Sequence, residues 1–208
     1  MISIDDTIEE IGRNALESAR RLEEAEKRKL KLPRAGSAGI ATALTWNAVQ
    51  RAYSPDPAEY FARAQGPGLQ CPIDIFEQLF VDHHDDAEFG TLVGPIDWGA
   101  VEWTEKHLSG AALRRIGVPR AYQYAVDEAR GRTAQNGFQD ERQEVMNHWR
   151  EAKTWMRSPI LLAGDLLQTA LQYELIVGTT RLGNLLGALD RQDVPESAQH
   201  TVWLGRPL

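Results

Sequence analysis

Residues 173–190 read YELIVGTTRLGNLLGALD, and this stretch decides the fold. The mostly apolar run Tyr173–Val177 predicts a buried strand, which ends at Gly178. The leucines that follow recur at the helical spacing i, i+3, i+4, i+7; they are Leu182, Leu185, Leu186 and Leu189. This period predicts an amphipathic helix that begins near Arg181. A strand, a tight turn and a helix are therefore expected in immediate succession.

The start of this helix carries groups that suit phosphate. The first N–H groups of a helix lack intrahelical partners, and the aligned peptide dipoles add partial positive charge there. Gly178 lets a ligand approach the backbone closely, and Thr179 or Thr180 can supply a hydroxyl. Arg181 adds a planar, permanently charged fork. The turn therefore predicts an anion site. The alternative is a capped structural turn with Arg181 in an internal ion pair, because the motif is neither a P-loop nor a dinucleotide fingerprint.

Weaker patterns predict the elements around this segment. Strands are expected at 91–93, at the alternating Val101–Trp103, at 160–162 and at 201–204. Helices are expected at 40–53, 54–64, 73–81, 111–116, 121–130 and 140–156, with a polar loop at 130–138. A long charged helix, Asp6–Leu32, begins with the capping-box pair Asp6 and Glu9. Together these predict a helical N-terminal extension over residues 1–89 and an α+β domain over residues 90–208.

Composition limits the classes of protein that remain. The chain has 208 residues and a formal net charge of −7, which argues against a surface covered by nucleic acid. Cys71 is the only cysteine, so an internal disulfide is excluded. The first residues are acidic where a signal peptide would be basic, and no stretch approaches the roughly 20 apolar residues of a membrane span. A cytoplasmic protein with no membrane span is expected.

The order of motifs resembles a known superfamily. Pro159-Ile160-Leu161-Leu162, then Tyr173–Gly178, two residues and Arg181-Leu182, is similar to the core of the ParB/sulfiredoxin superfamily. The resemblance implies a small mixed sheet flanked by helices. It also implies nucleotide binding, with the phosphates of ATP or CTP, neutralised by Mg²⁺, on Gly178, Thr179, Thr180 and Arg181. Members include NTPases and nucleases. In size the chain is similar to the fertility-inhibition factors of conjugative plasmids, small ATPases and DNases that inhibit conjugation, so a plasmid or phage setting is expected.

Departures from the superfamily pattern support a second hypothesis. Thr179 stands where sulfiredoxins carry their nucleophilic cysteine, so that chemistry is absent. Val177, Thr179 and Thr180 replace the acid and the two histidines of the kinase-like and nuclease-like members. The chain could therefore be a non-catalytic interaction or inhibitor module that retains the fold. Its N-terminal helix would then bind a protein partner.

Three further groups of side chains are candidates for chemistry. His83, His84 and Asp85 could ligate a metal ion, although the pattern also fits a polar helix end. Glu102 and Glu105 could hold Mg²⁺ or act as a general base, since early strands line the nucleotide pocket in the superfamily; the alternative is a solvated strand edge. A set of arginines could bind DNA phosphates or form surface ion pairs; they are Arg114, Arg115, Arg120, Arg130 and Arg132.

Overall fold

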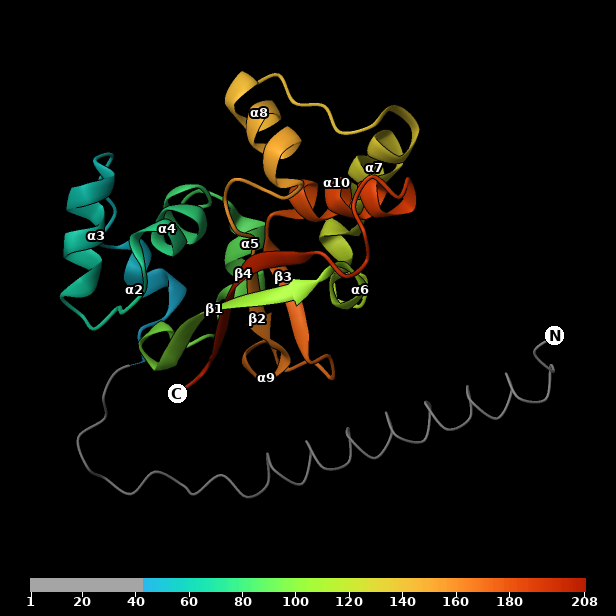
Figure 1. Cartoon of the computed structure of the whole chain (residues 1–208). Helices are drawn as coiled ribbons and strands as arrows, with labels where there is room; N and C mark the ends of the chain where they lie inside the picture. Colours follow the sequence, from blue (N-terminus) through green and yellow to red (C-terminus); the bar gives the residue numbers. More distant parts are fainter. Residues whose placement is uncertain (1–42) are drawn as a thin grey trace, which may run out of the picture. The chain divides into compact units, whose positions relative to one another are not determined.

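The structure is a computed structural model that describes residues 43–208 (Figure 1). By its contacts the part of the chain over residues 43–208 is one compact unit. Residues 43–89, which the sequence predicts as part of the extension, belong to this unit together with the sheet. The predicted helix Asp6–Leu32, and the protein partner expected for it, lie outside the described residues.

A four-stranded mixed sheet forms the centre of the second unit. Its strands are β1 (Val101–Ser109), β2 (Ile160–Ala163), β3 (Tyr173–Val177) and β4 (Gln199–Pro207), in the order β1-β4-β2-β3. β1 pairs antiparallel with β4 over nine positions, from Val101 opposite Pro207 to Ser109 opposite Gln199. β2 pairs parallel with β4 and antiparallel with β3. The predicted α+β class is confirmed, and β1 and β3 are the two edge strands.

Helices from the C-terminal part cover one face of this sheet. They are α6 (Gly110–Leu113), α7 (Arg120–Asn136), α8 (Gln143–Ala152) and α10 (Thr179–Asp190), and α9 (Gly164–Leu167) follows β2. Figure 1 shows α7, α8 and α10 together on one side of the strands. The loop predicted at 130–138 is wrong, because α7 continues to Asn136 and ends at Gly137, whose φ is 75°. Thr133 anchors this last part of α7 by donating to the Asn184 Oδ1 atom of α10 at 2.9 Å.

Helices from residues 43–100 cover the other face. They are α2 (Trp46–Gln50), α3 (Pro57–Gln65), α4 (Ile73–Phe76), the π-helix η1 (Glu77–Val81), α5 (Ala87–Val93) and the 3₁₀ helix η2 (Trp98–Ala100). The strand predicted at 91–93 is wrong, because Asp86 caps α5 by accepting from the Phe89 amide at 2.9 Å. Among the residues that the structure describes, no helix combines the length and apolar character needed to cross a membrane.

Two hydrophobic cores lie on the two faces of the sheet. Successive residues of a strand point to opposite faces, so Leu175 of β3 belongs to one core and Ile176 to the other. The Ile176 core is aromatic and contains Phe76, Phe80 and Trp98 from the N-terminal helices. The Leu175 core contains the leucines of α10. The strand β3 therefore leads into α10 with both faces buried, which fixes the position of the Gly178 turn.

Candidate functional site

The Gly178 turn joins β3 to α10. Gly178 adopts the left-handed conformation, with φ 103° and ψ 32°, which side chains other than glycine rarely tolerate. A Cβ atom at this position would also lie 2.9 Å from the Cβ atom of Pro159. The first backbone bond of α10 runs from the Leu182 amide to the Gly178 carbonyl at 2.9 Å. The amides of residues 179–181 have no acceptor within residues 43–208, as a helix start predicts.

Arg181 does not project from the helix start toward solvent, as a phosphate ligand would. Its Nη1 atom donates to the carbonyl of Arg157 at 2.7 Å, and its Nη2 atom donates to the Gln78 Oε1 atom at 2.8 Å. Burial, and then the charge of Arg157, lower the pKa of Arg181 to about 10, so the side chain stays cationic at neutral pH. The expectation of an open guanidinium is therefore corrected. Arg181 is engaged internally, with amide and carbonyl acceptors in place of the carboxylate of an ion pair.

Gln78 is the centre of a polar network beside this turn. Its side chain is fully buried on η1, and its Nε2 atom donates to the Asp74 Oδ2 atom at 3.1 Å and to the Ser158 carbonyl at 3.2 Å. Asp74 also accepts from the Arg157 Nε atom at 2.6 Å. We call this set the Gln78 network; it comprises Asp74, Glu77, Gln78, Arg157, Arg181 and Trp203. It connects α4 and η1 to the residues before β2, to β4 and to α10.

Sequence reasoning missed Asp74, Gln78 and Arg157 as partners of the turn. Gln78 and Arg181 are 103 positions apart in the chain, and Arg157 and Asp74 are 83 apart. No local motif marks such a pairing. A fully buried glutamine on a π-helix marks an unusual position, because π-helical turns are rare. This feature can be recognised in the structure but not in the sequence.

The candidate carboxylates Glu102 and Glu105 lie far from the Gly178 turn. Both are on β1, and two strands separate β1 from β3 in the sheet order. At a spacing of about 4.8 Å per strand, β1 and β3 are roughly 14 Å apart. Glu102 accepts from the Arg206 Nε atom at 2.9 Å, and Glu105 is exposed on the opposite face of the strand. The structure therefore does not bring these carboxylates to the phosphate site expected from the sequence.

The candidate metal ligands His83, His84 and Asp85 do not converge. The His83 ring stacks on Phe89 with its Nδ1 atom 3.3 Å from the Asp86 Oδ2 atom. The His84 ring stacks on Tyr53, with its Nδ1 atom 3.0 Å from the Val81 carbonyl. Within residues 43–208, no group of three His, Cys, Asp or Glu side chains could hold a metal ion. The metal-site prediction is corrected, because adjacent side chains diverge and each imidazole has another partner.

The arginines proposed for DNA contact are partly used in ion pairs. Arg114 pairs with Asp190 at 2.8 Å and with Glu196 at 2.6 Å, and Arg130 pairs with Asp190 at 2.7 Å. Arg132 lies 4.0 Å from Glu128. The two pairs with Asp190 connect the end of α6 and α7 to the end of α10, and the acidic partners reduce the positive charge available to DNA phosphates. DNA contact stays a prediction.

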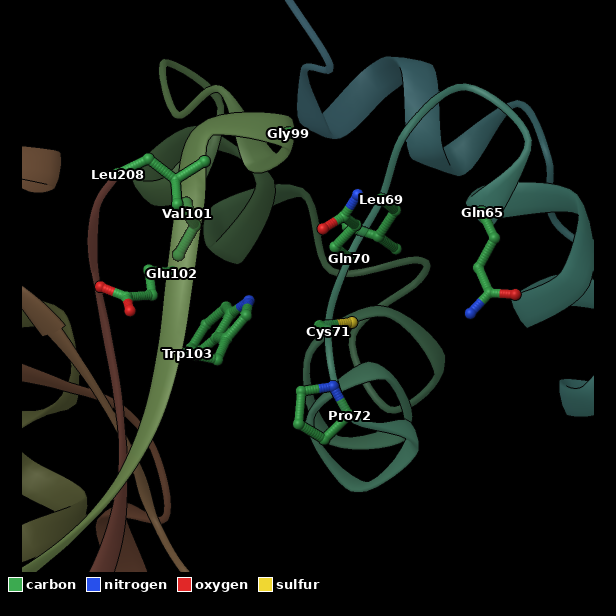
Figure 2. A pocket seen from close by; sticks show the side chains of 10 residues that line it. All are labelled: Gln65, Leu69, Gln70, Cys71, Pro72, Gly99, Val101, Glu102, Trp103 and Leu208. Atoms are coloured by element: carbon green, nitrogen blue, oxygen red, sulfur yellow. The ribbon is translucent and has the colours of Figure 1, made fainter.

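A pocket of about 530 Å³ opens elsewhere, beside the start of β1 (Figure 2). Its lining comprises Gln65, Leu69, Gln70, Cys71, Pro72, Gly99, Val101, Glu102, Trp103 and Leu208. Burial raises the pKa of the Cys71 thiol to about 12, so the thiol is a poor nucleophile at neutral pH. The Trp103 Nε1 atom is buried and has no hydrogen-bond partner in the described part of the chain. Among the site residues predicted from sequence, Glu102 lines this pocket.

Comparisons with models of protein families, with curated proteins and with solved structures find no match to this chain.

Proposed function

We propose that the chain is a ParB/sulfiredoxin-like domain that retains the fold as a non-catalytic protein-interaction module. The superfamily assignment is supported by the strand that follows Pro159 and by the β3–Gly178–α10 succession within a small mixed sheet. The departures at Val177, Thr179 and Thr180 support the absence of superfamily chemistry. An inhibitor of conjugation on a plasmid is one setting for such a module.

The observation that carries this proposal is the engagement of Arg181. A guanidinium that binds phosphate must present free N–H groups to the ligand. Here two of those groups donate to Gln78 and to the Arg157 carbonyl at 2.8 and 2.7 Å. Releasing them would leave the buried Gln78 oxygen without a donor, which costs free energy. Arg181 stands at the position of the superfamily's phosphate-binding arginine, and its hydrogen bonds support a structural role for it in this chain.

One observation favours the competing function, the binding of ATP or CTP with Mg²⁺ followed by hydrolysis or nuclease action. The amides after Gly178 lack acceptors within the described residues, and Thr180 is exposed. A phosphate could bind these amides and a threonine hydroxyl without using Arg181. Substitution of the threonines would weaken nucleotide binding of this kind. The hydrogen bonds of the Gln78 network would not have to break when the nucleotide binds.

Nucleotide titration distinguishes the two functions. A ligand that binds only the native state raises its melting temperature. We expect no change with ATP, CTP or GTP at millimolar concentration, with or without Mg²⁺, and no release of phosphate or nicking of plasmid DNA. The matched variant is Thr180→Val, which removes an exposed hydroxyl and is expected to fold as the wild type does. A nucleotide-dependent rise in the wild type that this variant reduces would establish the competing function.

A further inference from the structure

Within residues 43–208, β1 is an edge strand, and its outer side presents a regular set of backbone groups. The Leu208 amide donates to the Ala100 carbonyl at 3.0 Å, and the Gly110 amide donates to the Ala198 carbonyl at 3.1 Å. In an antiparallel pair, residues bonded to the neighbouring strand alternate with residues that face away. The even-numbered residues of β1 therefore bond to β4. The backbone groups that face away belong to Val101, Trp103, Glu105 and His107, and no described residue pairs with them.

The pocket described above lies beside the first three residues of this edge. Val101, Glu102 and Trp103 line it from β1, and the segment 69–72 lines it from the other side. Figure 2 shows this segment alongside β1, with the Trp103 ring directed from the strand toward it. The pocket has a volume of about 530 Å³ and is largely open to solvent. The outer side of β1 therefore has a bounded space beside its first residues.

The chemistry of the lining indicates what the space accepts. The buried Trp103 indole N–H has no hydrogen-bond partner among the described residues, so a peptide carbonyl that reached it would satisfy this donor. Pro72, which is partly exposed at the pocket, offers apolar contact to a side chain opposite Trp103. Glu105 is exposed on the same face of the strand as Trp103 and has no ion-pair partner within residues 43–208. A basic residue opposite Glu105 would form the favourable cross-strand pair.

We propose that β1 is a strand-addition site for an extended peptide of a partner protein, in which an apolar residue and a Lys or Arg stand two positions apart. This inference rests on the proposed interaction function and specifies its surface. Main-chain hydrogen bonds to the odd-numbered residues of β1 hold the peptide, and the pocket and Glu105 select its side chains. Spacing by two places both selected side chains on one face of the added strand.

Amide hydrogen exchange of the full chain tests the proposal directly. The probe is a synthetic eight-residue peptide of threonine with one leucine and one arginine two positions apart. We expect slower exchange at the amides of Val101, Trp103, Glu105 and His107, whereas the even-numbered amides of β1 are already bonded and change little. The control peptide carries N-methyl groups at alternate backbone amides, which removes its donors. Absence of protection at millimolar peptide, or equal protection by the methylated peptide, would refute the proposal.

A charge exchange tests the selection by Glu105. Glu105→Lys is an exposed change and is expected to fold. It should weaken binding of the arginine peptide about two- to fivefold and favour a peptide with glutamate in that position, as cross-strand charge pairs do. Cys71 is the only thiol in the chain, so a peptide in the pocket should also slow its alkylation by iodoacetamide. An unchanged ratio of affinities for the two peptides would contradict the inference.

Two further outcomes separate this inference from the proposed function. If a nucleotide raises the melting temperature while the peptide still protects the odd amides, the non-catalytic function fails and the strand-addition site stands. If neither ligand acts, the strand-addition site fails and the non-catalytic assignment is unaffected. Protection of the odd amides that grows with protein concentration, without peptide and with a dimer in sedimentation, would show that a second copy occupies the edge, and would overturn the inference.

Discussion

Removal of the Arg181 side chain should destabilise the protein, because the guanidinium is part of the Gln78 network. Arg181→Ala removes charge-assisted hydrogen bonds of 2.7 and 2.8 Å, each worth about 1.5 to 3 kcal/mol. The half-buried position of Arg181 favours the lower value for each bond. The expected loss in the free energy of unfolding is therefore about 3 kcal/mol. For a chain of this size, the melting temperature should fall by roughly 6 to 12 °C.

Urea denaturation, followed by tryptophan fluorescence, measures this loss. The matched control is Arg142→Ala, because Arg142 pairs with Asp140 at 2.8 Å on the surface with 68% of its side chain exposed. An exposed pair contributes about 0.2 to 1 kcal/mol. A double-mutant cycle that combines Arg181→Ala with Gln78→Ala should give a coupling free energy different from zero, since the two side chains share a hydrogen bond. If Arg181→Ala costs no more than Arg142→Ala, the structural role of Arg181 is wrong.

Three further predictions concern buried groups. His200 is 1% exposed, and burial lowers its pKa. Because the unfolded chain then binds a proton that the folded chain does not, the free energy of unfolding should fall as the pH drops below about 6.5. In urea titrations, His200→Gln should flatten this dependence on pH. Thr133→Val should cost about 1 to 3 kcal/mol by leaving the buried Asn184 Oδ1 atom without its donor, and a loss below about 0.5 kcal/mol would contradict this. Gly187→Ala would place a Cβ atom 2.5 Å from a carbonyl oxygen of α7, which should lower the free energy of unfolding by about 1 to 3 kcal/mol. The control is Gly131→Ala, whose Cβ atom would meet nothing within 4 Å and which should be neutral or stabilising in thermal melts.

The elements that the sequence predicted well have strong local signals. The strands β2 and β3 are short apolar runs that follow Pro159 or precede Gly178, and α10 has a leucine period of one helical face. Leu92 and Val93 are apolar as well, but the cap supplied by Asp86 places them in a helix. The end of α7 contains no large apolar residue. It packs on α10 through Ala129 and Thr133, and such small or polar contacts produce no hydrophobic period.

The candidate site was predictable only in its backbone. Gly178 and the following helix start are local features, and the turn adopts the left-handed conformation that glycine permits. The direction of the Arg181 side chain depends on acceptors in η1 and before β2, which lie 103 and 24 positions away in the chain. Contacts between residues so far apart in the sequence depend on the whole fold. The carboxylates on β1 failed to join the turn for the same reason, because strand order is a property of the complete sheet.

The long pairing of β1 with β4 has a consequence for synthesis. Ser109 lies opposite Gln199, so on the order of ninety further residues must be synthesised after β1 before β4 can pair with it. At the usual rates of translation this synthesis takes roughly 5 to 20 s. During that interval both edges of β1 are unprotected, and exposed strand edges invite aggregation. The charges of Glu102, Glu105 and Lys106 are suited to this period, since charged edge residues discourage premature pairing. We expect these charges to limit aggregation of the nascent chain until β4 pairs with β1.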